Sequence, residues 1–325
     1  MKAVVVADPG GYDKLVITEV ADPQPGTDKV VVSVSIAGCN WGDTQMRSGT
    51  YSFPVKYPII PGYEVAGTVT ALGSDVRGIK LGDRVAALLP CGGYAQMCLA
   101  SADMLIALPQ EIELATAAAF PIQALTAYHM LFTVSHLRPG DTVLVHAIGG
   151  GVGLYCTQLA VRAGARVIGT VGTPGKEKLA LTYGAEKVVV AGNEDFVATA
   201  LALTGGKGVD LLIDSLGGKT LDRSFAAVRA LGHLINIGEA EGAPLDNIRQ
   251  SLMERSQTFT RFSLGKFDPT TPAWREAIAY LLRAISDGWL KVPIETVFPF
   301  DQSAAMHQRL ESRRVSGKLL LAVGR

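Results

Sequence analysis

The residues best suited to binding a ligand form a glycine-rich turn near the middle of the chain. An apolar run, Val143-Leu144-Val145-His146-Ala147, leads into Ile148-Gly149-Gly150-Gly151-Val152-Gly153, and an apolar, alanine-rich segment follows as far as Ala163. This is the order of a strand, a tight turn and a helix. In such a turn the backbone N–H groups approach a pyrophosphate closely, and the helix N-terminus adds partial positive charge. The pattern therefore predicts a dinucleotide site.

The match to the dinucleotide fingerprint is incomplete. Gly151 and Gly153 match its last part, but Ala147 stands where its first glycine usually lies. The alternative interpretation is a tight connection of the kind that any α/β domain contains. The flanking strand and helix favour the binding interpretation, because the motif requires both of them.

The segment after the next strand indicates which dinucleotide would bind. The strand Arg166–Val171 ends in Gly172-Thr173-Pro174-Gly175-Lys176, with no carboxylate at its tip. Sheets that prefer NAD have an Asp or Glu there, which binds the ribose hydroxyls. A 2′-phosphate would be repelled by a carboxylate and attracted by Thr173 and Lys176, so the segment favours NADPH. Alternatively, Lys176 merely begins a solvated helix face that continues with Glu177 and Lys178.

The elements around this turn fall into two regions of different character. The first third of the chain contains short β runs separated by Gly/Pro turns, which predict a small barrel-like β domain. These runs are Lys2–Val6, Leu15–Val20, Lys29–Ile36, Glu64–Ala71, Arg84–Leu89 and Tyr94–Leu99.

Strands and helices alternate after about Pro121. Alternation at this period predicts parallel strands joined by right-handed crossovers, that is, a doubly wound sheet. The expected strands are Thr142–Ala147, Arg166–Val171, Lys187–Val190, Val209–Asp214, His233–Ile237 and Phe259–Leu264. The expected helices run to Ala163, over Lys176–Tyr183, Phe196–Leu203 and Thr220–Ala230, and then over Pro272–Asp287 and Gln302–Arg309 before a closing strand at Lys318–Val323.

The composition excludes several classes of partner. The 30 basic and 30 acidic residues balance, so the chain has no electrostatic footprint for nucleic acid or an anionic membrane. Aromatic residues make up 7% of the chain, too few to favour a base-stacking platform. Charged residues make up only 18%, which predicts large cores and a buried interface between protomers.

The sequence also predicts a cytoplasmic protein. Two segments without charged residues, Leu114–Leu137 and Val143–Val161, are interrupted by polar residues and by the glycine turn, so we expect domain core rather than membrane spans. The apolar stretch near the N-terminus is too short for a signal peptide. The four cysteines lack Cys-x-x-Cys spacing, and free thiols are the expected state.

Several short motifs occur in order along the chain, and together they are specific. They are Ala37–Asp43, Arg47–Tyr51, Pro61–Gly67, Gly82–Val85, Leu125–Ala127, His146–Gly153, Gly169–Thr173 with Lys176, and Asp214–Gly217. With these motifs the chain resembles, over essentially its whole length, the quinone oxidoreductases of the medium-chain dehydrogenase/reductase superfamily, which include zeta-crystallin. The resemblance implies an α/β protein of two domains: a GroES-like, β-rich catalytic domain (1–121 and 267–325) and a doubly wound, Rossmann NADPH-binding domain (122–266). It also implies that the nicotinamide lies in the cleft between them.

The resemblance assigns site residues one by one. Catalysis would fall to Tyr51 and Asn40. Together with Thr173 from the loop described above, the expected cofactor-binding residues are Thr126, Gly150, Gly151, Val152, Gly153, Lys176, Ser215, Gly238, Leu264 and Arg313. One departure concerns the phosphate: the family often has a tyrosine near it, where this chain has Ala191 or a neighbour. The phosphate site would therefore depend on Lys176.

The resemblance also predicts that the chain binds no metal. The zinc alcohol dehydrogenases, a sister branch, have a cysteine ligand where this chain has Asn40 and a histidine ligand where it has Tyr63. A tetrahedral catalytic zinc needs three protein ligands from Cys, His or carboxylate. Cys39 is next to the ligand position rather than at it, and Glu64 alone cannot hold the metal.

Chemistry without a metal limits the substrate. Hydride transfer to an isolated ketone creates a localised alkoxide, for which zinc is an effective Lewis acid. Reduction of an enone or quinone spreads the charge over an enolate or phenolate, so hydrogen-bond donors such as the Tyr51 hydroxyl and the Asn40 amide can suffice. Alternatively, Tyr51 is a loop aromatic packed on Phe53, water supplies the proton, and Asn40 orients the substrate or the ribose.

We therefore expect an NADPH:quinone oxidoreductase-type medium-chain reductase, zinc-independent and homodimeric, acting on a small quinone or enone. The dimer would pair through the edge strand Phe259–Leu264. Two alternatives remain at this point: a 2-enoyl-thioester reductase built on the same scaffold, and a non-catalytic nucleotide-binding structural protein.

Overall fold

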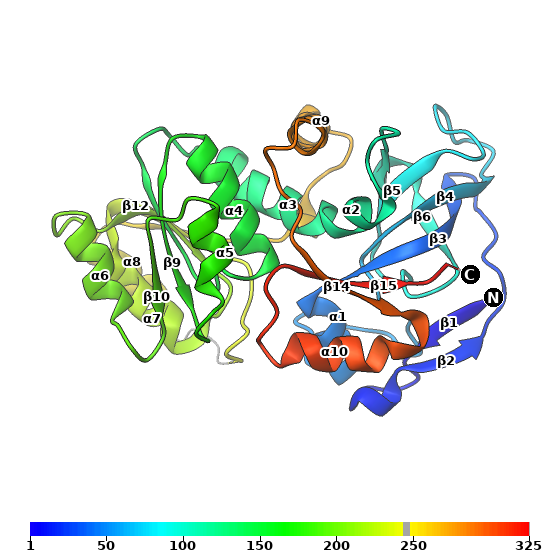
Figure 1. The fold of residues 1–325 in the computed structure, drawn as a ribbon, viewed down its shortest axis with the longest axis horizontal. Helices are drawn as coiled ribbons and strands as arrows, with labels where there is room; N and C mark the ends of the chain where they lie inside the picture. The colour runs from blue at the N-terminus through cyan, green and yellow to red at the C-terminus, as the bar shows by residue number, and fades with distance from the viewer. Residues whose placement is uncertain (243–247, 325) are drawn as a thin grey trace. The chain divides into compact units, whose positions relative to one another are not determined.

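The computed structural model describes residues 1–242 and 248–324, and the chain divides into two compact units (Figure 1). The first unit comprises Met1–Ile122 and Asp268–Arg325, and the second comprises Gln123–Phe267. Helix α3 (Pro121–Tyr128) contains the point at which the chain passes from the first unit to the second.

The first unit is built on a seven-stranded mixed sheet. Its strand order is β14-β15-β3-β4-β5-β7, with β6 also paired to β3. All pairs are antiparallel except β14 with β15, which is parallel. The strands are β3 (Lys29–Cys39), β4 (Glu64–Leu72), β5 (Arg84–Leu88), β6 (Met97–Ser101), β7 (Leu105–Ala107), β14 (Ile294–Pro299) and β15 (Lys318–Ala322), and β1 (Lys2–Val5) with β2 (Val16–Glu19) forms a separate antiparallel pair.

The core of the first unit comes from residues far apart in the sequence. Val30, Val32 and Val34 alternate along β3 and are buried with Leu319 and Leu321 of β15. Alternation of this kind places one set of side chains on one face of a sheet. The C-terminal strand therefore completes a domain that the N-terminal third begins.

Four helices lie wholly within the first unit. They are α1 (Trp41–Ser48), α2 (Leu114–Ala119), α9 (Pro272–Ser286) and α10 (Ser303–Glu311), and short 3₁₀ turns occur at Tyr12–Lys14 (η1), Ala102–Met104 (η2) and Phe300–Gln302 (η5). Helix α1 follows β3 directly and ends at Gly49, whose φ is +79°. The sequence pattern did not predict α1, although motifs cover both of its ends.

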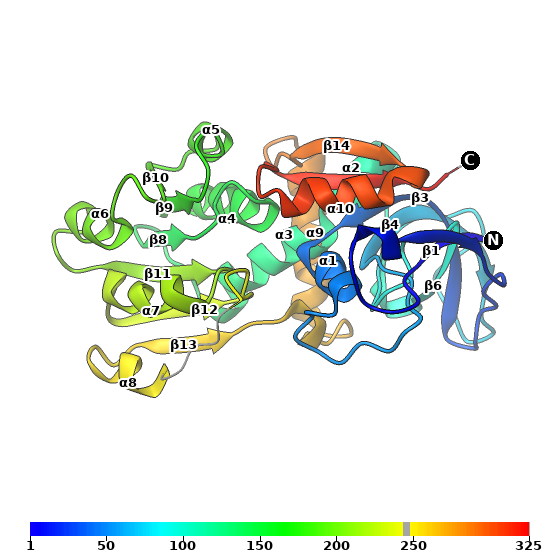
Figure 2. The ribbon, with the colours of Figure 1, turned by 90° about the horizontal axis from the view of Figure 1, so that it is seen from below.

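The second unit contains a six-stranded sheet in which every neighbouring pair is parallel, in the order β10-β9-β8-β11-β12-β13 (Figure 2). The strands are β8 (Thr142–Val145), β9 (Arg166–Val171), β10 (Lys187–Val190), β11 (Val209–Asp214), β12 (Val228–Asn236) and β13 (Thr258–Arg261). Strand order reverses direction between β8 and β11. Ligands of open α/β sheets bind at such a switch point, beyond the carboxyl ends of the strands. The predicted doubly wound sheet is confirmed.

The helices of the second unit are α4 (Gly151–Arg162), α5 (Glu177–Thr182), α6 (Phe196–Leu203), α7 (Gly218–Ala227) and α8 (Ile248–Met253), with a π-helical segment at His129–Val134 (η3) and a 3₁₀ turn at Leu264–Lys266 (η4). Four predicted elements need correction. Strand β8 ends at Val145 rather than Ala147, and β12 begins at Val228 rather than His233. Strand β13 ends at Arg261 rather than Leu264, because Leu264 begins the 3₁₀ turn. Helix α7 ends at Ala227 rather than Ala230, because Val228 is buried and pairs with Val209.

Over the described residues, no helix is both long enough and apolar enough to span a membrane.

Candidate active site

The glycine turn joins β8 to α4 at the carboxyl edge of the parallel sheet. Gly150 is the N-cap of α4 with an extended backbone (φ −85°, ψ 171°), and the helix begins at Gly151. The first turn of α4 therefore presents its unpaired N–H groups at this edge, as a pyrophosphate site requires.

Ala147 takes the conformation that explains why the fingerprint usually has a glycine at this position. Its φ is +50°, in the left-handed region. An L-residue with a Cβ pays roughly 1–2 kcal/mol there. The departure from the fingerprint thus changes the residue and keeps the backbone shape.

Ala147→Gly should stabilise the protein by about 0.5–1 kcal/mol, because relief of the left-handed strain exceeds the entropic cost of glycine. The measurement is the midpoint of thermal unfolding, with Ala163→Gly as control, since Ala163 has an ordinary φ of −80° at the end of α4. A lower midpoint for Ala147→Gly, equal to that of the control, would show that the strain is absent.

The glycines of the turn are required for different reasons. A Cβ on Gly149 would lie 2.5 Å from the carbonyl oxygen of Lys176, and one on Gly153 would lie 2.6 Å from the Cα of Ile148. A Cβ on Gly151 would overlap the carboxamide of Gln123, with 2.0 Å to its Oε1. Packing against backbone atoms therefore explains Gly149 and Gly153 without any ligand, whereas the contact at Gly151 is with the end of the flexible Gln123 side chain.

Gly150 is different. A Cβ there would meet only the carbonyl oxygen of Ala147 at 3.2 Å, and the backbone is one that any residue adopts. Gly172, just beyond β9 at the same edge, has no atom within 4 Å of a Cβ built on it. Gly172 therefore has open space beside it, and Gly150 has only the Ala147 carbonyl close by, so both positions leave room at this edge of the sheet.

The loop after β9 carries the residues expected to bind a 2′-phosphate. Thr173 and Lys176 are both half-buried, and the packing of Gly149 against the Lys176 backbone brings this loop to the glycine turn. The Glu177 carboxylate lies at the same loop, where it accepts a hydrogen bond from the Gly175 N–H at 2.6 Å. Ala191, at the position of the family tyrosine, is exposed and contributes no hydroxyl.

The remaining cofactor-binding candidates of the second unit also follow strand ends. Ser215 comes after β11, Gly238 after β12 and Leu264 after β13. A Cβ on Gly238 would lie 3.0 Å from the Ser215 carbonyl oxygen, so these two loops are adjacent. Thr126 lies on α3, one turn after Gln123, and is 8% exposed. The structure therefore gathers the strand-end candidates along one edge of the sheet.

Two buried residues that sequence reasoning missed hold the Ser215 loop. The Asp214 carboxylate accepts from the backbone N–H groups of Leu216 (3.0 Å) and Gly217 (3.0 Å) and from the Asn236 amide (2.6 Å). Burial raises the pKa of Asp214, and these hydrogen bonds oppose the rise. In the sequence Asp214 stands out only as the first residue of a motif, and nothing near Asn236 reveals that it reaches the neighbouring strand.

His146, which precedes the turn, is a core residue and not a titrating group. Its Nδ1 lies 2.8 Å from Thr170 Oγ1 and its Nε2 lies 2.9 Å from Ser224 Oγ. Ser224 donates its proton to the Thr220 carbonyl, so it accepts from Nε2–H, and Nδ1 accepts from Thr170. Burial lowers the pKa of His146 to about 3, and the ring is neutral.

The first unit holds the two proposed catalytic residues near the start of α1. Asn40 is the N-cap of α1 and is 8% exposed. Its Nδ2 donates to Glu64 Oε1 at 2.9 Å, and its Oδ1 accepts from Lys318 Nζ at 2.7 Å. Lys318 also pairs with Glu64, and the second Glu64 oxygen accepts from the Ile122 N–H at 2.8 Å. Sequence reasoning missed Lys318, which lies on β15, far along the chain.

Tyr51 belongs to a small aromatic cluster. Its ring centroid lies 5.7 Å from that of Phe53 and 6.1 Å from that of Tyr63. Tyr63 has a buried hydroxyl without a hydrogen-bond partner among the described residues. Burial raises the pKa of Tyr63 far above its usual value, and the neighbouring Tyr51 hydroxyl adds to the rise. The Tyr63 phenol is therefore protonated at neutral pH. The packing of Tyr51 on Phe53 does occur.

Asp43 ties the start of α1 to the loop that carries Tyr63. Its carboxylate accepts from the backbone N–H groups of Asn40 (2.8 Å) and Gly62 (2.9 Å). Burial raises the pKa of Asp43 to about 7, with the two backbone hydrogen bonds opposing the rise. This completely buried carboxyl group fixes Asn40 and Tyr63 on the same part of the unit.

Arg313 is the remaining cofactor-binding candidate. It lies in the first unit, is exposed, and has a φ of +59°. Its guanidinium carbon lies 5.9 Å from the centroid of the Trp41 ring, within the range of a cation–π contact.

The side chains at the expected zinc positions do not suit a metal. The Asn40 oxygen faces an ammonium group, and Tyr63 is a protonated phenol. Burial raises the pKa of the Cys39 thiol to about 12, so it is not a thiolate. Among the described residues, no three His, Cys, Asp or Glu side chains gather closely enough to hold a metal ion. Zinc needs three such ligands.

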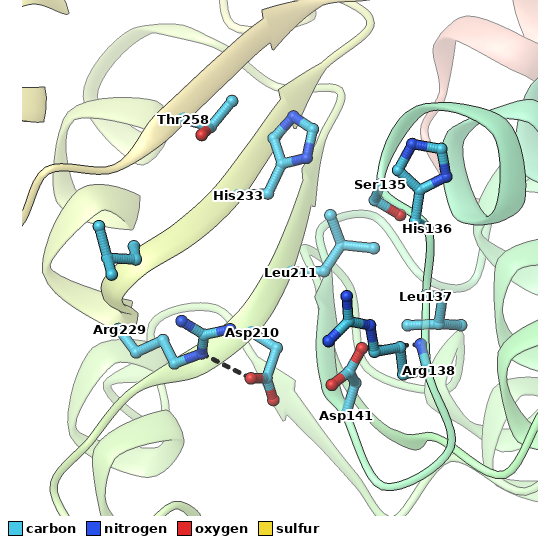
Figure 3. A pocket seen from close by; sticks show the side chains of 11 residues that line it. Ser135, His136, Leu137, Arg138, Asp141, Asp210, Leu211, Arg229, His233 and Thr258 are labelled. Atoms are coloured by element: carbon cyan, nitrogen blue, oxygen red, sulfur yellow. Dashed lines mark hydrogen bonds and ion pairs between the residues drawn. The ribbon is translucent and has the colours of Figure 1, made fainter.

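A cavity of about 290 Å³ lies in the second unit (Figure 3). Asp141, Asp210 and Thr258, at the amino ends of β8, β11 and β13, line it together with His136 and His233. Its Arg229 is paired with Asp210 at 2.6 Å. It is therefore at the opposite edge from the glycine turn and forms no part of the candidate site.

Comparison with known proteins covers the whole chain. Residues 26–110 match the family model of the alcohol dehydrogenase GroES-like domain, and residues 151–283 match that of the zinc-binding dehydrogenases. A probable quinone oxidoreductase of Schizosaccharomyces pombe is 36% identical over 92% of this chain and 90% of its own length. The crystal structure of Escherichia coli quinone oxidoreductase complexed with NADPH has a TM-score of 0.95 and 34% identity, covering 99% of this chain and 100% of that one.

The chain is also similar to one part of a much larger protein. A phenolphthiocerol/phthiocerol polyketide synthase protein of Mycobacterium tuberculosis is 31% identical over 98% of this chain, which spans 14% of that protein. The curated relatives from Schizosaccharomyces pombe, Pseudomonas aeruginosa and Escherichia coli are named quinone oxidoreductases, and the matches span 90%, 99% and 96% of their lengths. The chain therefore belongs to the quinone oxidoreductase family, with a GroES-like domain and a Rossmann domain.

Proposed function

We propose that this chain is an NADPH-dependent, zinc-free reductase that transfers hydride to quinones or other α,β-unsaturated carbonyl compounds. The observation that carries the proposal is the buried cluster of Asn40, Glu64 and Lys318. It puts an ammonium–carboxylate pair at the position where a zinc enzyme of this superfamily needs a thiolate ligand. Substrates whose reduced form spreads its negative charge are those that such a site can serve.

The dinucleotide fits the residues of the second unit. Gly150 and Gly172 leave room for the dinucleotide to approach the protein backbone. The N-terminus of α4 complements its pyrophosphate, and Thr173 and Lys176 complement its 2′-phosphate. Thr126, Gly151, Val152, Gly153, Ser215, Gly238, Leu264 and Arg313 complete the proposed set. NADPH, when bound, supplies the hydride.

The first unit supplies hydrogen-bond donors for the product oxygen. Hydride and one proton convert a quinone into a hydroquinone and leave NADP⁺. The Tyr51 hydroxyl is the proposed donor to the developing oxyanion, and the Asn40 amide is the second. Their buried supports, Asp43 and the Lys318–Glu64 pair, hold that part of the unit in place.

Lys176→Ala should weaken NADPH binding by roughly 1–3 kcal/mol, the worth of a charge-assisted contact, and should change NADH binding little. Titration calorimetry with both nucleotides measures this, and Lys178→Ala, at an exposed position of α5, is the control. Equal losses for both nucleotides in Lys176→Ala would assign Lys176 another role.

The proposal includes a homodimer. Among the described residues, strand β13 is the last of the parallel sheet and pairs only with β12. An exposed edge of this kind invites pairing, and a two-fold partner would extend the sheet. Light scattering at micromolar concentration should give twice the 34.3 kDa mass of the chain. A monomer under those conditions would contradict this part of the proposal.

The proposed location is the cytoplasm. All four cysteines belong to the described residues and carry free thiols. This state is the one that a reducing compartment maintains.

The experiment that tests the function is a screen of NADPH oxidation with quinones, enones and 2-enoyl thioesters. Turnover of quinones or enones well above that of thioesters is the expected result. Preference for thioesters would favour the alternative of a 2-enoyl-thioester reductase. NADPH binding without any turnover would favour a non-catalytic structural protein.

A further inference from the structure

The first unit contains a completely buried ammonium group that no step of the proposed reaction uses. Lys318 is 1% exposed and Glu64, with which it pairs, is 0% exposed. A buried ion pair contributes little net stability, because desolvation offsets the attraction, and apolar residues of similar volume often serve as well. Stability alone is therefore a weak reason for Lys318 and Glu64 to be charged.

The pair determines which way the Asn40 carboxamide points. An ammonium group only donates, so the Asn40 atom 2.7 Å from Lys318 Nζ has to be the oxygen. A carboxylate only accepts, so the atom 2.9 Å from Glu64 Oε1 has to be the nitrogen. A carboxamide between two neutral groups could exchange the positions of its oxygen and its NH2 group at little cost. Here the exchanged form would place the NH2 group against the ammonium and the oxygen against the carboxylate.

The orientation leaves one N–H of Asn40 Nδ2 outside the Lys318–Glu64 cluster. Nδ2 has two protons, and Glu64 accepts one of them. The hydrogen bond from the ammonium to Oδ1 polarises the amide and strengthens its remaining N–H as a donor. The neighbouring backbone is fixed as well, since Asp43 accepts from the Asn40 N–H at 2.8 Å.

We propose that Lys318 is the positioning residue of this site. This role rests on the proposed function. Lys318 holds the Asn40 carboxamide so that its remaining N–H donates to the substrate oxygen that becomes negative on hydride transfer. Lys318 acts through Asn40 only, and Glu64 fixes the other end of the same amide. In this chain the two charged side chains thus orient a neutral donor where a zinc enzyme would place a metal ligand.

The test is a double-mutant cycle on kcat. Lys318→Met is made together with Glu64→Gln, so that no unpaired carboxylate is left buried, and this pair of changes is combined with Asn40→Ala. We expect the pair to lower kcat about 10- to 100-fold, the worth of one oriented donor, with NADPH affinity within about threefold. In the Asn40→Ala protein the same two substitutions should lower kcat less than about threefold, because the group that Lys318 orients is gone.

Two outcomes of this cycle would overturn the proposal. One is an unchanged kcat in the Lys318/Glu64 variant. The other is a fold-loss of kcat in that variant that multiplies fully with the fold-loss caused by Asn40→Ala. Lys29→Met, at a partly exposed lysine of the same unit, should keep kcat and is the control for a lysine-to-methionine change. If the Lys318→Met/Glu64→Gln variant does not fold, Lys318→Gln combined with Glu64→Gln, which keeps polar side chains at both positions, gives the same cycle.

A second measurement separates this proposal from the proposed function. In the wild-type protein, NMR should show slow hydrogen exchange of the Asn40 side-chain amide. In the Lys318→Met/Glu64→Gln variant this exchange should be at least tenfold faster. This readout needs no turnover, so a protein inactive toward quinones would still test the positioning role. Equal exchange in the two proteins would contradict it.

Discussion

Tyr51→Phe should lower kcat for quinone reduction by about 10- to 1000-fold while NADPH affinity stays unchanged. The change removes the hydroxyl of the proposed donor but keeps the ring that packs against Phe53 and Tyr63. The measurement is kcat at saturating quinone, under conditions where hydride transfer limits the rate.

Phe53→Leu is the matched control, because it disturbs the same ring packing without removing a hydroxyl. We expect its kcat to change much less than that of Tyr51→Phe. If Tyr51→Phe keeps the wild-type kcat, and Tyr51→Ala mainly raises KM, Tyr51 only shapes the pocket. The proton would then come from water, and Asn40 would be the main donor.

Gly150→Asp should weaken NADPH binding at least 100-fold, or about 2.7 kcal/mol. The backbone of Gly150 accepts any residue, and a Cβ there meets only the Ala147 carbonyl at 3.2 Å. The fold should therefore tolerate the change. A carboxylate at the N-cap of α4 would, however, occupy the space of the pyrophosphate and repel its charge.

Gly26→Asp is the control for this variant. Gly26 is exposed in the first unit, and a Cβ on it would have no atom closer than 3.9 Å. Both variants should unfold within a few degrees of the wild type, and only Gly150→Asp should lose the nucleotide. Retained NADPH affinity in Gly150→Asp would place the dinucleotide away from the glycine turn.

The regular elements of the second unit are largely predictable from local sequence. The predicted bounds of Arg166–Val171, Lys187–Val190, Phe196–Leu203 and Val209–Asp214 match the structure. The three strands among these segments are apolar runs bounded by turns, which is the pattern that buried parallel strands produce. The predicted β13 is too long, because the apolar residues Phe262 and Leu264 continue past its last paired residue.

The first unit is harder to predict from periodicity. Helix α1 has polar residues such as Asp43 and Arg47 on its buried side, so it lacks the apolar stripe by which a helix is recognised. Asp43 accepts a hydrogen bond from the Gly62 N–H, and Arg47 Nη2 pairs with Glu311 of α10. Partners that lie so far along the chain leave no signal in the local sequence.

The candidate site shows the same division. The glycine turn and the Thr173–Lys176 loop are contiguous in the sequence, and their spacing alone identified them. The support of Asn40 could not be found in this way, because Glu64 and Lys318 lie on β4 and β15 and meet only when the sheet forms. The left-handed Ala147 also required coordinates, since a residue with a Cβ rarely signals a positive φ.

The central claim is hydride transfer from NADPH to a conjugated carbonyl without a metal. The most direct measurement combines metal analysis with turnover on one sample: the protein is treated exhaustively with a chelator, its zinc content is determined by elemental analysis, and NADPH oxidation with a quinone is followed. We expect full turnover in protein that contains no stoichiometric zinc, and no gain when zinc is added back. Stoichiometric zinc that is lost together with activity on chelation, and that restores activity when returned, would contradict the account.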